Sequence, residues 1–381
     1  MSRKLFILLS FVVLFVSVLD YKIIPFYSRL GLDFSNQYGF HHCQNDSQIV
    51  YKTPAVECPD FEARPYVYPP LLYVSYFWTR LFNSNDQAYA FFVFLYLVSF
   101  ILIIYIWSNR SLISILFGIG LFFSFPSLFL LERGNSDLFI TLSWSLGYFF
   151  YSRRKEWFSG AFLAFSVFSK LYPVYGIMIL FGHIYKNFFK NINLVKSFTL
   201  SSLFFVLITP YLWFIYLVDV LPKWIKASLP VLNLAHSLKS LPVGGSLLFF
   251  LAVACWFIAS LKVSREKIGF VWSGALALST FNNGVSFDYN LVTFFPLALY
   301  LFDYLRESKS SLLKYLFVGT CFAILGSRYP FQNVESYPKF RLVFIAISMI
   351  AIPYLCFDVS FEFKKLLARF RFYLSRIRLP S

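Results

Sequence analysis

Long apolar runs alternate with short polar segments along almost the whole chain. Runs long enough to cross a hydrocarbon core of ~30 Å recur along the chain, and in hydrocarbon a backbone must satisfy its own polar groups, which favours helices. The pattern therefore predicts an all-α polytopic integral membrane protein with about twelve transmembrane helices. The predicted crossings lie near residues 5–19, 88–107, 111–130, 138–151, 157–169, 171–186, 197–217, 244–261, 269–282, 289–305, 313–327 and 341–358.

The stretch 157–186 is where the number of crossings depends on charge. A single helix there would move the following basic residues to the other side of the membrane, against the positive-inside pattern. Two short helices that meet outside at residues 169–173 keep every basic segment on one side, so we expect two. The apolar stretch 66–82 is expected to be a helix lying along the outer surface, because a crossing there would also reverse the later topology.

Composition excludes a soluble globular domain, and the distribution of charge gives no reason to expect a nucleic-acid-binding protein. The 381-residue chain is 59% hydrophobic and 14% charged, whereas soluble globular domains carry about 25% charged residues. Its net charge of +16 does not imply a nucleic-acid partner, because the basic residues collect in short segments between the apolar runs, as the positive-inside rule describes. These segments are residues 3–4, 153–155, 186–196, 262–267, 306–314 and 364–378.

We expect a single integral-membrane domain over residues 1–381, in a cell membrane of the bacterial inner-membrane kind, with both termini cytoplasmic. The run 5–19 has a short basic start, but no small-residue cleavage site follows it, so it is predicted to be an uncleaved span. The tail 361–381 interleaves apolar and basic residues, a pattern typical of an amphipathic helix on the anionic cytoplasmic leaflet. No internal repeat is visible.

Residues 20–87 contain the one long polar stretch, which we expect to be an external catalytic loop carrying juxtamembrane helices. Cys43 and Cys58 lie in it, on the side where disulfides persist, so a disulfide between them is expected. Zinc bound with His41 and His42 is the competing interpretation. Adjacent histidines seldom converge on one ion, so no metal is expected.

Two polar groups in this loop have the chemistry of a transfer site. Asp33 follows the first span, and a carboxylate shielded by aromatics near a membrane surface can act as a general base toward a hydroxyl. The alternative is a solvated loop aspartate. Arg64 precedes the rigid segment Pro65–Pro70 and offers a planar fork suited to phosphate. That segment is also the start of a helix, an interpretation compatible with function.

Two later polar turns complete a candidate outer pocket. The turn 132–137 places charges between two short spans, which is costly unless something is bound, and its Asn-Ser-Asp helix start offers backbone amides to an anion. A simple capped turn is the alternative. Lys170 between two apolar helices must snorkel, pair or meet a ligand charge, and the adjacent Pro173 favours the ligand. Together these groups indicate a pocket for a phosphorylated lipid with a carboxylate beside it.

Taken in order, these motifs resemble family 87 of the glycosyltransferases, in superfamily C of multi-span enzymes that use polyprenyl-phosphate sugars. The resemblance covers roughly residues 1–300. Its strongest piece is Tyr-x-Tyr-Pro-Pro-Leu at 66–71. The other pieces are Asp33, Tyr51, Arg-Gly-Asn-x-Asp at 133–137 and Lys-x-x-Pro at 170–173.

The resemblance implies an inverting transfer of a hexose, mannose or a related sugar, from a polyprenyl-phosphate-linked donor to a lipid or glycan acceptor at the external face. It implies no metal and no other cofactor. Asp33 would be the catalytic base. The donor phosphate would be neutralised by Arg64, Arg133 and Lys170, which are assigned by electrostatics as much as by motif. The remaining pocket residues are expected to be Tyr66, Tyr68, Glu132, Asn135, Asp288 and Tyr289.

The chain departs from the family at residues 287–292, where a His-Tyr pair is often found. Tyr289 stands in place of the histidine and Asp288 adds a second carboxylate, so the base is either Asp33 or Asp288. Two other functions remain open. A transporter or flippase of a lipid-linked sugar would keep polar residues near the midplane and often shows repeats. A glycan polymerase or ligase would share the pocket but use an oligosaccharide donor.

Overall fold

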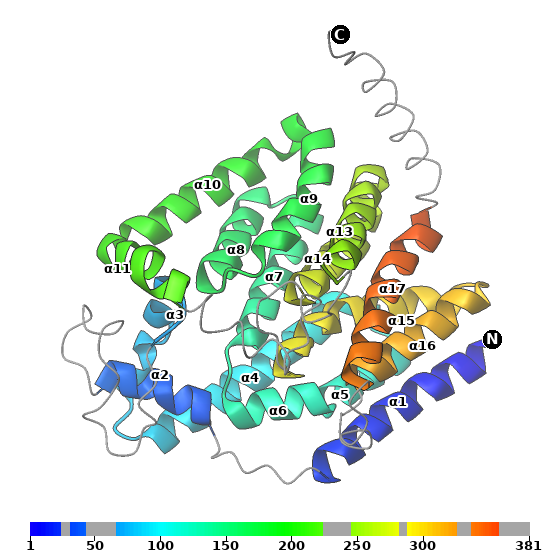
Figure 1. The fold of residues 1–381 in the computed structure, drawn as a ribbon, viewed down its shortest axis with the longest axis horizontal. Helices are drawn as coiled ribbons and strands as arrows, with labels where there is room; N and C mark the ends of the chain where they lie inside the picture. Colours follow the sequence, from blue (N-terminus) through cyan, green and yellow to red (C-terminus); the bar gives the residue numbers. More distant parts are fainter. Residues whose placement is uncertain (24–30, 43–65, 224–244, 282–287, 326–336, 358–381) are drawn as a thin grey trace, which may run out of the picture.

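The described part of the chain is built from helices and the turns that join them (Figure 1). This computed structural model describes residues 1–23, 31–42, 66–223, 245–281, 288–325 and 337–357, and these contain no β-strand. The all-α class is therefore confirmed for these residues, and the tail 361–381 lies outside them. The helices before residue 190 are α1 (Arg3–Ile23), α2 (Leu32–His42), α3 (Pro70–Ser75), η1 (Phe77–Leu81), α4 (Asn85–Trp107), α5 (Leu112–Phe122), α6 (Phe125–Arg133), α7 (Asp137–Ser152), α8 (Glu156–Ser169) and α9 (Val174–Lys186). The later ones are η2 (Phe188–Asn191), α10 (Ile192–Leu207), α11 (Pro210–Ile215), the π-helical turn η3 (Tyr216–Val220), α13 (Gly245–Lys262), η6 (Arg265–Lys267), α14 (Ile268–Phe281), η7 (Asp288–Phe294), α15 (Phe295–Glu307), α16 (Ser311–Leu325) and α17 (Tyr337–Phe357).

Among the described residues, α4 is the one helix that is both long and apolar enough to cross a membrane by itself. Two bent pairs reach that length and hydropathy together. These are α5 with α6, bent by 48°, and residues 188–207 with 210–223, bent by 92°. Other apolar helices, such as α9 and α16, are shorter. The described residues thus give one span, or up to three if each bent pair is one, and the twelve crossings stay a prediction.

Prolines interrupt three of the predicted crossings. Pro126 lies in the first turn of α6, Pro210 begins α11, and Pro296 lies in the first turn of α15. Proline has no backbone N–H, so it fits the first turn of a helix but breaks an interior. For this reason the predicted crossings 111–130 and 197–217 are each built from more than one helix, and 289–305 begins as the 3₁₀ helix η7 and continues as α15.

The predicted break within 157–186 is confirmed. α8 ends at Ser169 and α9 begins at Val174, with Lys170 in an extended conformation between them. α8 packs against α7 and α10, whereas α9 packs against α13 and α14. The chain therefore passes from one group of helices to another at this break. The stretch 66–82 is likewise broken, into α3 and η1 with Tyr76 between them.

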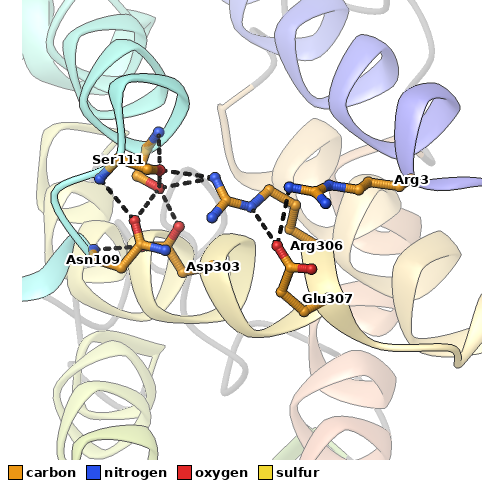
Figure 2. Close-up of polar contacts among 7 residues, drawn as sticks. Arg3, Asn109, Ser111, Asp303, Arg306 and Glu307 are labelled. Atoms are coloured by element: carbon orange, nitrogen blue, oxygen red, sulfur yellow. Dashed lines mark hydrogen bonds and ion pairs between the residues drawn. The ribbon is translucent and has the colours of Figure 1, made fainter.

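One end of α4 carries a polar network that joins α1, α15 and the turn after α4 (Figure 2). The backbone N–H of Asn109 donates to Oδ2 of Asp303 at 2.7 Å. Glu307 pairs with two cations, Arg3 at 3.1 Å and Arg306 at 3.2 Å. The network therefore gathers basic residues from both halves of the sequence at one end of the helical bundle.

The other end of α4 carries the candidate site. The hydroxyl of Tyr89 in its second turn donates to the carbonyl of Leu131 in α6 at 2.6 Å. At 1.5 Å per residue, the 23 residues of α4 span about 34 Å between these two ends. The outward side chains between them are apolar, for example Phe94 and Ile101, 56% and 65% exposed. The polar groups therefore lie at the two ends of an apolar middle.

Candidate functional site

The turn between α6 and α7 is the centre of the site. Gly134 follows Arg133 with a φ of 69°, in the left-handed region where a residue with a Cβ is strained. Its N–H donates to the carbonyl of Leu131 at 3.0 Å, and the N–H of Asn135 donates to that of Leu130 at 3.2 Å. This is the bonding of a Schellman turn. The Arg-Gly-Asn sequence thus ends α6 and holds Arg133 and Asn135 on either side of a tight turn.

α2 begins directly against this turn. Gly31 has a φ of 70°, and its N–H donates to the carbonyl of Glu132 at 2.6 Å. A Cβ on Gly134 would lie 2.5 Å from the Cβ of Phe34, so packing also requires glycine there. Asp33 therefore lies in the first turn of a helix, where its charge is favourable. This helix lies within the stretch 20–87, which was expected to carry juxtamembrane helices, and these contacts fix its start on the turn.

Asp33 and Arg133 form an ion pair at the partly exposed side of the site. Nη2 of Arg133 lies 2.6 Å from Oδ1 of Asp33, and Nδ2 of Asn135 donates to Oδ2 at 3.1 Å. The side chains of Asp33 and Arg133 are 15% and 18% exposed. The structure therefore brings together the residue predicted as base and one residue predicted to bind the phosphate, and it binds them to each other.

Lys170 and Asp137 form a second, deeper ion pair. Nζ of Lys170 lies 2.9 Å from Oδ1 of Asp137 and 3.0 Å from Oδ1 of Asn135. The side chain of Asp137 is 0% exposed and that of Lys170 is 8% exposed. Lys170 was expected to meet a ligand charge. It pairs within the chain instead, because a fully buried carboxylate requires a nearby cation.

Three further groups hold the Asp137 carboxylate and the start of α7. The hydroxyl of Tyr172 donates to Oδ1 at 2.9 Å, and Nδ2 of Asn290 in η7 donates to Oδ2. The backbone N–H of Asp137 donates to Oδ1 of Asn135 at 3.2 Å. The helix start that was expected to offer its amides to an anion thus has its first amide bound by the chain itself. Asn135 connects the two ion pairs.

Tyr68 belongs to the site, and Tyr66 supports it from one side. Nζ of Lys170 lies 5.2 Å from the centre of the Tyr68 ring, a cation–π distance. Burial, with the nearby carboxylates of Asp33 and Asp137, raises the pKa of Tyr68, so its hydroxyl stays a proton donor. The ring of Tyr66 packs against Tyr68 at 5.7 Å and belongs to an apolar cluster with residues of α2 and α11.

The other predicted pocket residues lie at the edges of the described site. Glu132 is buried in the last turn of α6, beside Arg133. Asp288 and Tyr289 begin η7, so their backbone directly precedes Asn290, and their side chains lie outside the description. The predicted phosphate partner and the predicted disulfide stay predictions, because their residues lie outside the described part of the chain. These residues are Arg64, Cys43 and Cys58.

His41 and His42 anchor α2 through their rings. Nε2 of His41 lies 2.9 Å from the carbonyl oxygen of Tyr73, and Nε2 of His42 lies 3.0 Å from that of Thr79. A carbonyl only accepts, so both Nε2 atoms carry the proton and are occupied. Within the described ranges no group of three or more His, Cys, Asp or Glu could hold a metal ion. The Nε2 atoms of His41 and His42 are therefore not available as zinc ligands.

An apolar cavity of about 310 Å³ lies beside the polar groups, between α3, α4, α7 and α8. Tyr76 connects the two. Its ring lines the cavity and lies 6.2 Å from the ring of Phe34, the residue after Asp33. Burial, with smaller contributions from Tyr68, Asp137 and Asp33, raises the pKa of its hydroxyl. The apolar lining includes Leu95, Phe139, Leu142, Leu146, Phe162 and Phe165.

Sequence reasoning gave no individual role to Asp137, Tyr172, Asn290 and Tyr76, although Asp137 and Tyr172 lie within the motifs at 133–137 and 170–173. For Asp137 a signal existed, because a carboxylate and Lys170 in two apolar surroundings each need a partner of opposite charge. Tyr172 stands in the Lys-x-x-Pro motif, but tyrosine is common in this chain. Asn290 and Tyr76 carry no local signal, because their roles depend on contacts with residues far away in sequence.

Comparisons extend the description of the site no further. Protein-family models, curated proteins and solved structures give no match to this chain. The candidate site is therefore defined by the contacts that its own residues make.

Proposed function

We propose that the chain is a membrane glycosyltransferase. It moves a hexose, in the first instance mannose, from a polyprenyl-phosphate-linked donor to a hydroxyl of a lipid or glycan acceptor. The observation that carries the proposal is the ion pair of Asp33 and Arg133, at 2.6 Å, together with an apolar cavity of about 310 Å³. Two rings that line this cavity, Tyr76 and Trp78, pack against Phe34, the residue after Asp33. A base, a cation for phosphate and space for an apolar chain are the groups that this reaction requires.

Asp33 is assigned as the base. The oxygen of the acceptor hydroxyl bonds to the anomeric carbon from the face opposite the phosphate, and the proton of the hydroxyl passes to the Asp33 carboxylate. The bond between that carbon and the phosphate oxygen breaks, and its electron pair stays on the departing polyprenyl phosphate. The configuration at the anomeric carbon inverts. Asn135, 3.1 Å from Oδ2, orients the carboxylate for this step.

Arg133 is assigned to the phosphate. A guanidinium offers planar, charge-assisted hydrogen bonds that match phosphate oxygens, and it stabilises the negative charge that the leaving group gains. Among the described cations of the site, Arg133 is the more exposed, since Lys170 is buried with Asp137. Arg64, in the segment before Tyr66, is proposed as a second phosphate partner.

The cavity supports a lipid-linked donor. Its lining is apolar, and Tyr76 in that lining packs against Phe34, the residue after Asp33. An isoprenoid chain in the cavity would leave its phosphate at the polar side of Tyr76. A water-soluble sugar donor has no group to fill such a space.

The surface of the described helices supports placement in a membrane. Large apolar side chains of α4 and α10 point outward, which is costly in water and favourable in lipid. The basic residues Arg3, Arg110 and Arg306 lie at the end of α4 away from Asp33. By the positive-inside rule that end is cytoplasmic and the site is external. We propose about twelve crossings in a cell membrane, with both termini cytoplasmic and an arrangement of the superfamily C kind.

The test is reconstitution of the purified chain in liposomes with radiolabelled polyprenyl-phosphate mannose and a panel of extracted lipids. The wild type is expected to give a labelled product, and Asp33→Asn is expected to lose about a hundredfold or more in rate. Asp86→Asn is the matched control. It removes the same charge from the exposed first turn of α4, where no residue of the described chain pairs with it.

The outcomes separate the open alternatives. Undiminished transfer by a folded Asp33→Asn variant would contradict Asp33 as the base and direct attention to Asp288. Passage of the unchanged labelled donor across the bilayer, with no product, would instead support a flippase. Activity restricted to oligosaccharide donors would support a polymerase or ligase.

A further inference from the structure

The two cations of the site differ in how firmly they are held. Lys170 pairs with Asp137 at 2.9 Å, and the same carboxylate accepts hydrogen bonds from Tyr172 and Asn290. These groups come from α7, the α8–α9 break and η7, and the pair is buried. Removing Lys170 from it would leave a fully buried carboxylate without its cation, which is strongly unfavourable. Lys170 is therefore a fixed part of the structure.

Arg133 is exchangeable by the same reasoning. Its partner Asp33 lies at the partly exposed edge, so a carboxylate released from Arg133 would not be stranded in the interior. Asp33 would also keep its hydrogen bond from Asn135, at 3.1 Å. A second anion can thus replace Asp33 on the guanidinium at modest cost.

We infer that the donor phosphate and the Asp33 carboxylate compete for Arg133, so that donor binding releases the base. The inference rests on the proposed function and adds the order in which donor and acceptor act. Phosphate and carboxylate both fit the guanidinium fork, and phosphate carries at least as much negative charge. After the exchange, Oδ1 of Asp33 no longer faces a cation and can accept the proton of an acceptor hydroxyl. The donor binds first, and the acceptor is activated second.

The exchange requires no movement of helices. The N–H of Gly31 is bonded to the carbonyl of Glu132 at 2.6 Å, and Phe34 lies against Gly134, so the backbone on both sides of the ion pair is fixed. Rotation of the Arg133 and Asp33 side chains is sufficient. Until the phosphate arrives, the ion pair holds the base inactive.

The experiment measures binding to the purified full-length protein in detergent. The probe is a fluorescently labelled polyprenyl phosphate, and the corresponding polyprenol is the neutral comparison. Asp33→Asn removes the competing charge and is expected to tighten phosphate binding by about tenfold, or ~1.4 kcal/mol. Arg133→Gln is expected to weaken it by about tenfold or more. Asp86→Asn removes a charge outside the pair and is expected to leave the affinity unchanged.

The double variant Asp33→Asn with Arg133→Gln isolates the competition. If Asp33 acts by occupying Arg133, its replacement no longer tightens binding once Arg133 is gone. Tightening that persists in the double variant, or no tightening in the single one, overturns the inference alone. A wild type that binds polyprenol as well as polyprenyl phosphate overturns the proposed function with it. Asp33→Ser takes the place of the asparagine variant if thermal unfolding shows that the latter does not fold.

Discussion

The ammonium nitrogen of Lys170 lies 2.9 Å from Oδ1 of Asp137, although 33 residues separate the two in the sequence. Lys170 stands at the break between α8 and α9, and Asp137 is the first residue of α7. Their contact links the start of α7 to the end of α8, two helices that also pack against each other. Since both side chains are buried, each depends on the other to remain there as an ion.

Breaking this pair should therefore destabilise the whole fold. Asp137→Ala is expected to lower the free energy of unfolding by about 3–5 kcal/mol, because it leaves the Lys170 charge buried without its partner. The measurement is unfolding in detergent followed by circular dichroism. Asp86→Ala is the control and is expected to change stability by less than about 0.5 kcal/mol. A loss from Asp137→Ala as small as the control's would show that solvent reaches the pair.

Gly134→Ala should destabilise the turn between α6 and α7. The left-handed conformation costs a residue with a Cβ about 1–2 kcal/mol, and the new Cβ would also approach the Cβ of Phe34 to 2.5 Å. Gly147→Ala in α7 is the matched control, since its nearest new contact would be Leu163 at 3.3 Å with no strained backbone. We expect a lower melting temperature for the first variant than for the second. Equal melting temperatures would argue against the tight packing of α2 on the turn.

His41 should make stability depend on pH. Burial, with smaller contributions from the neighbouring Arg80 and His42, lowers the pKa of His41 from 6.5 to about 4, despite its bond to the Tyr73 carbonyl. The unfolded chain then binds a proton that the folded one does not, so this contribution is complete above pH 6.5 and is lost as the pH falls toward about 4. Its size is at most about 3 kcal/mol.

The check compares melting temperatures of the wild type and His41→Phe between pH 5 and pH 7.5, a window chosen around the ordinary histidine pKa of about 6.5. Phenylalanine keeps a ring for stacking on Tyr73 but cannot titrate. The variant is expected to show a flatter profile than the wild type. Parallel profiles would exclude His41 as the titrating group.

Filling the cavity should weaken binding of the donor. Leu95→Trp places a larger ring among the lining residues, and it is expected to raise KM for a polyprenyl-phosphate sugar by about tenfold, while overpacking costs about 1–3 kcal/mol of stability. Leu97→Trp, two residues along α4 and exposed, is the control with unchanged KM. An unchanged KM in a folded Leu95→Trp variant would remove the cavity from the donor path.

Local signals accounted for much of the helical framework. The run 88–107 is long, apolar and free of proline, and it forms α4 almost as expected. The break before Pro173 could be predicted because a single helix over 157–186 would have moved the later basic segments to the other side of the membrane. By contrast, α2 was missed because its eleven residues are mostly polar, and the contacts that fix it come from α3, α4 and α6.

Which charged residues of the site pair with each other could not be predicted from the sequence, for a different reason. Asp33, Arg133 and Lys170 could each be recognised as a costly charge near an apolar run, but nothing local says which charges meet. Arg133 pairs with an aspartate 100 residues before it, and Lys170 with one 33 residues before it. Such pairing follows from the packing of α2, α7 and α8, which only the assembled fold defines.

The hydrogen bond from Asn290 to Asp137 spans 153 residues, and this separation has a consequence for biosynthesis. A ribosome that has just released α7, α8 and α9 has made Lys170 and its partner carboxylate, but not η7. Until η7 is inserted, the Asp137 carboxylate lacks the hydrogen bond from Asn290, and we expect the incompletely packed chain to be exposed to quality-control proteases. Nascent chains cut before residue 288 should therefore be degraded faster than chains that extend past η7.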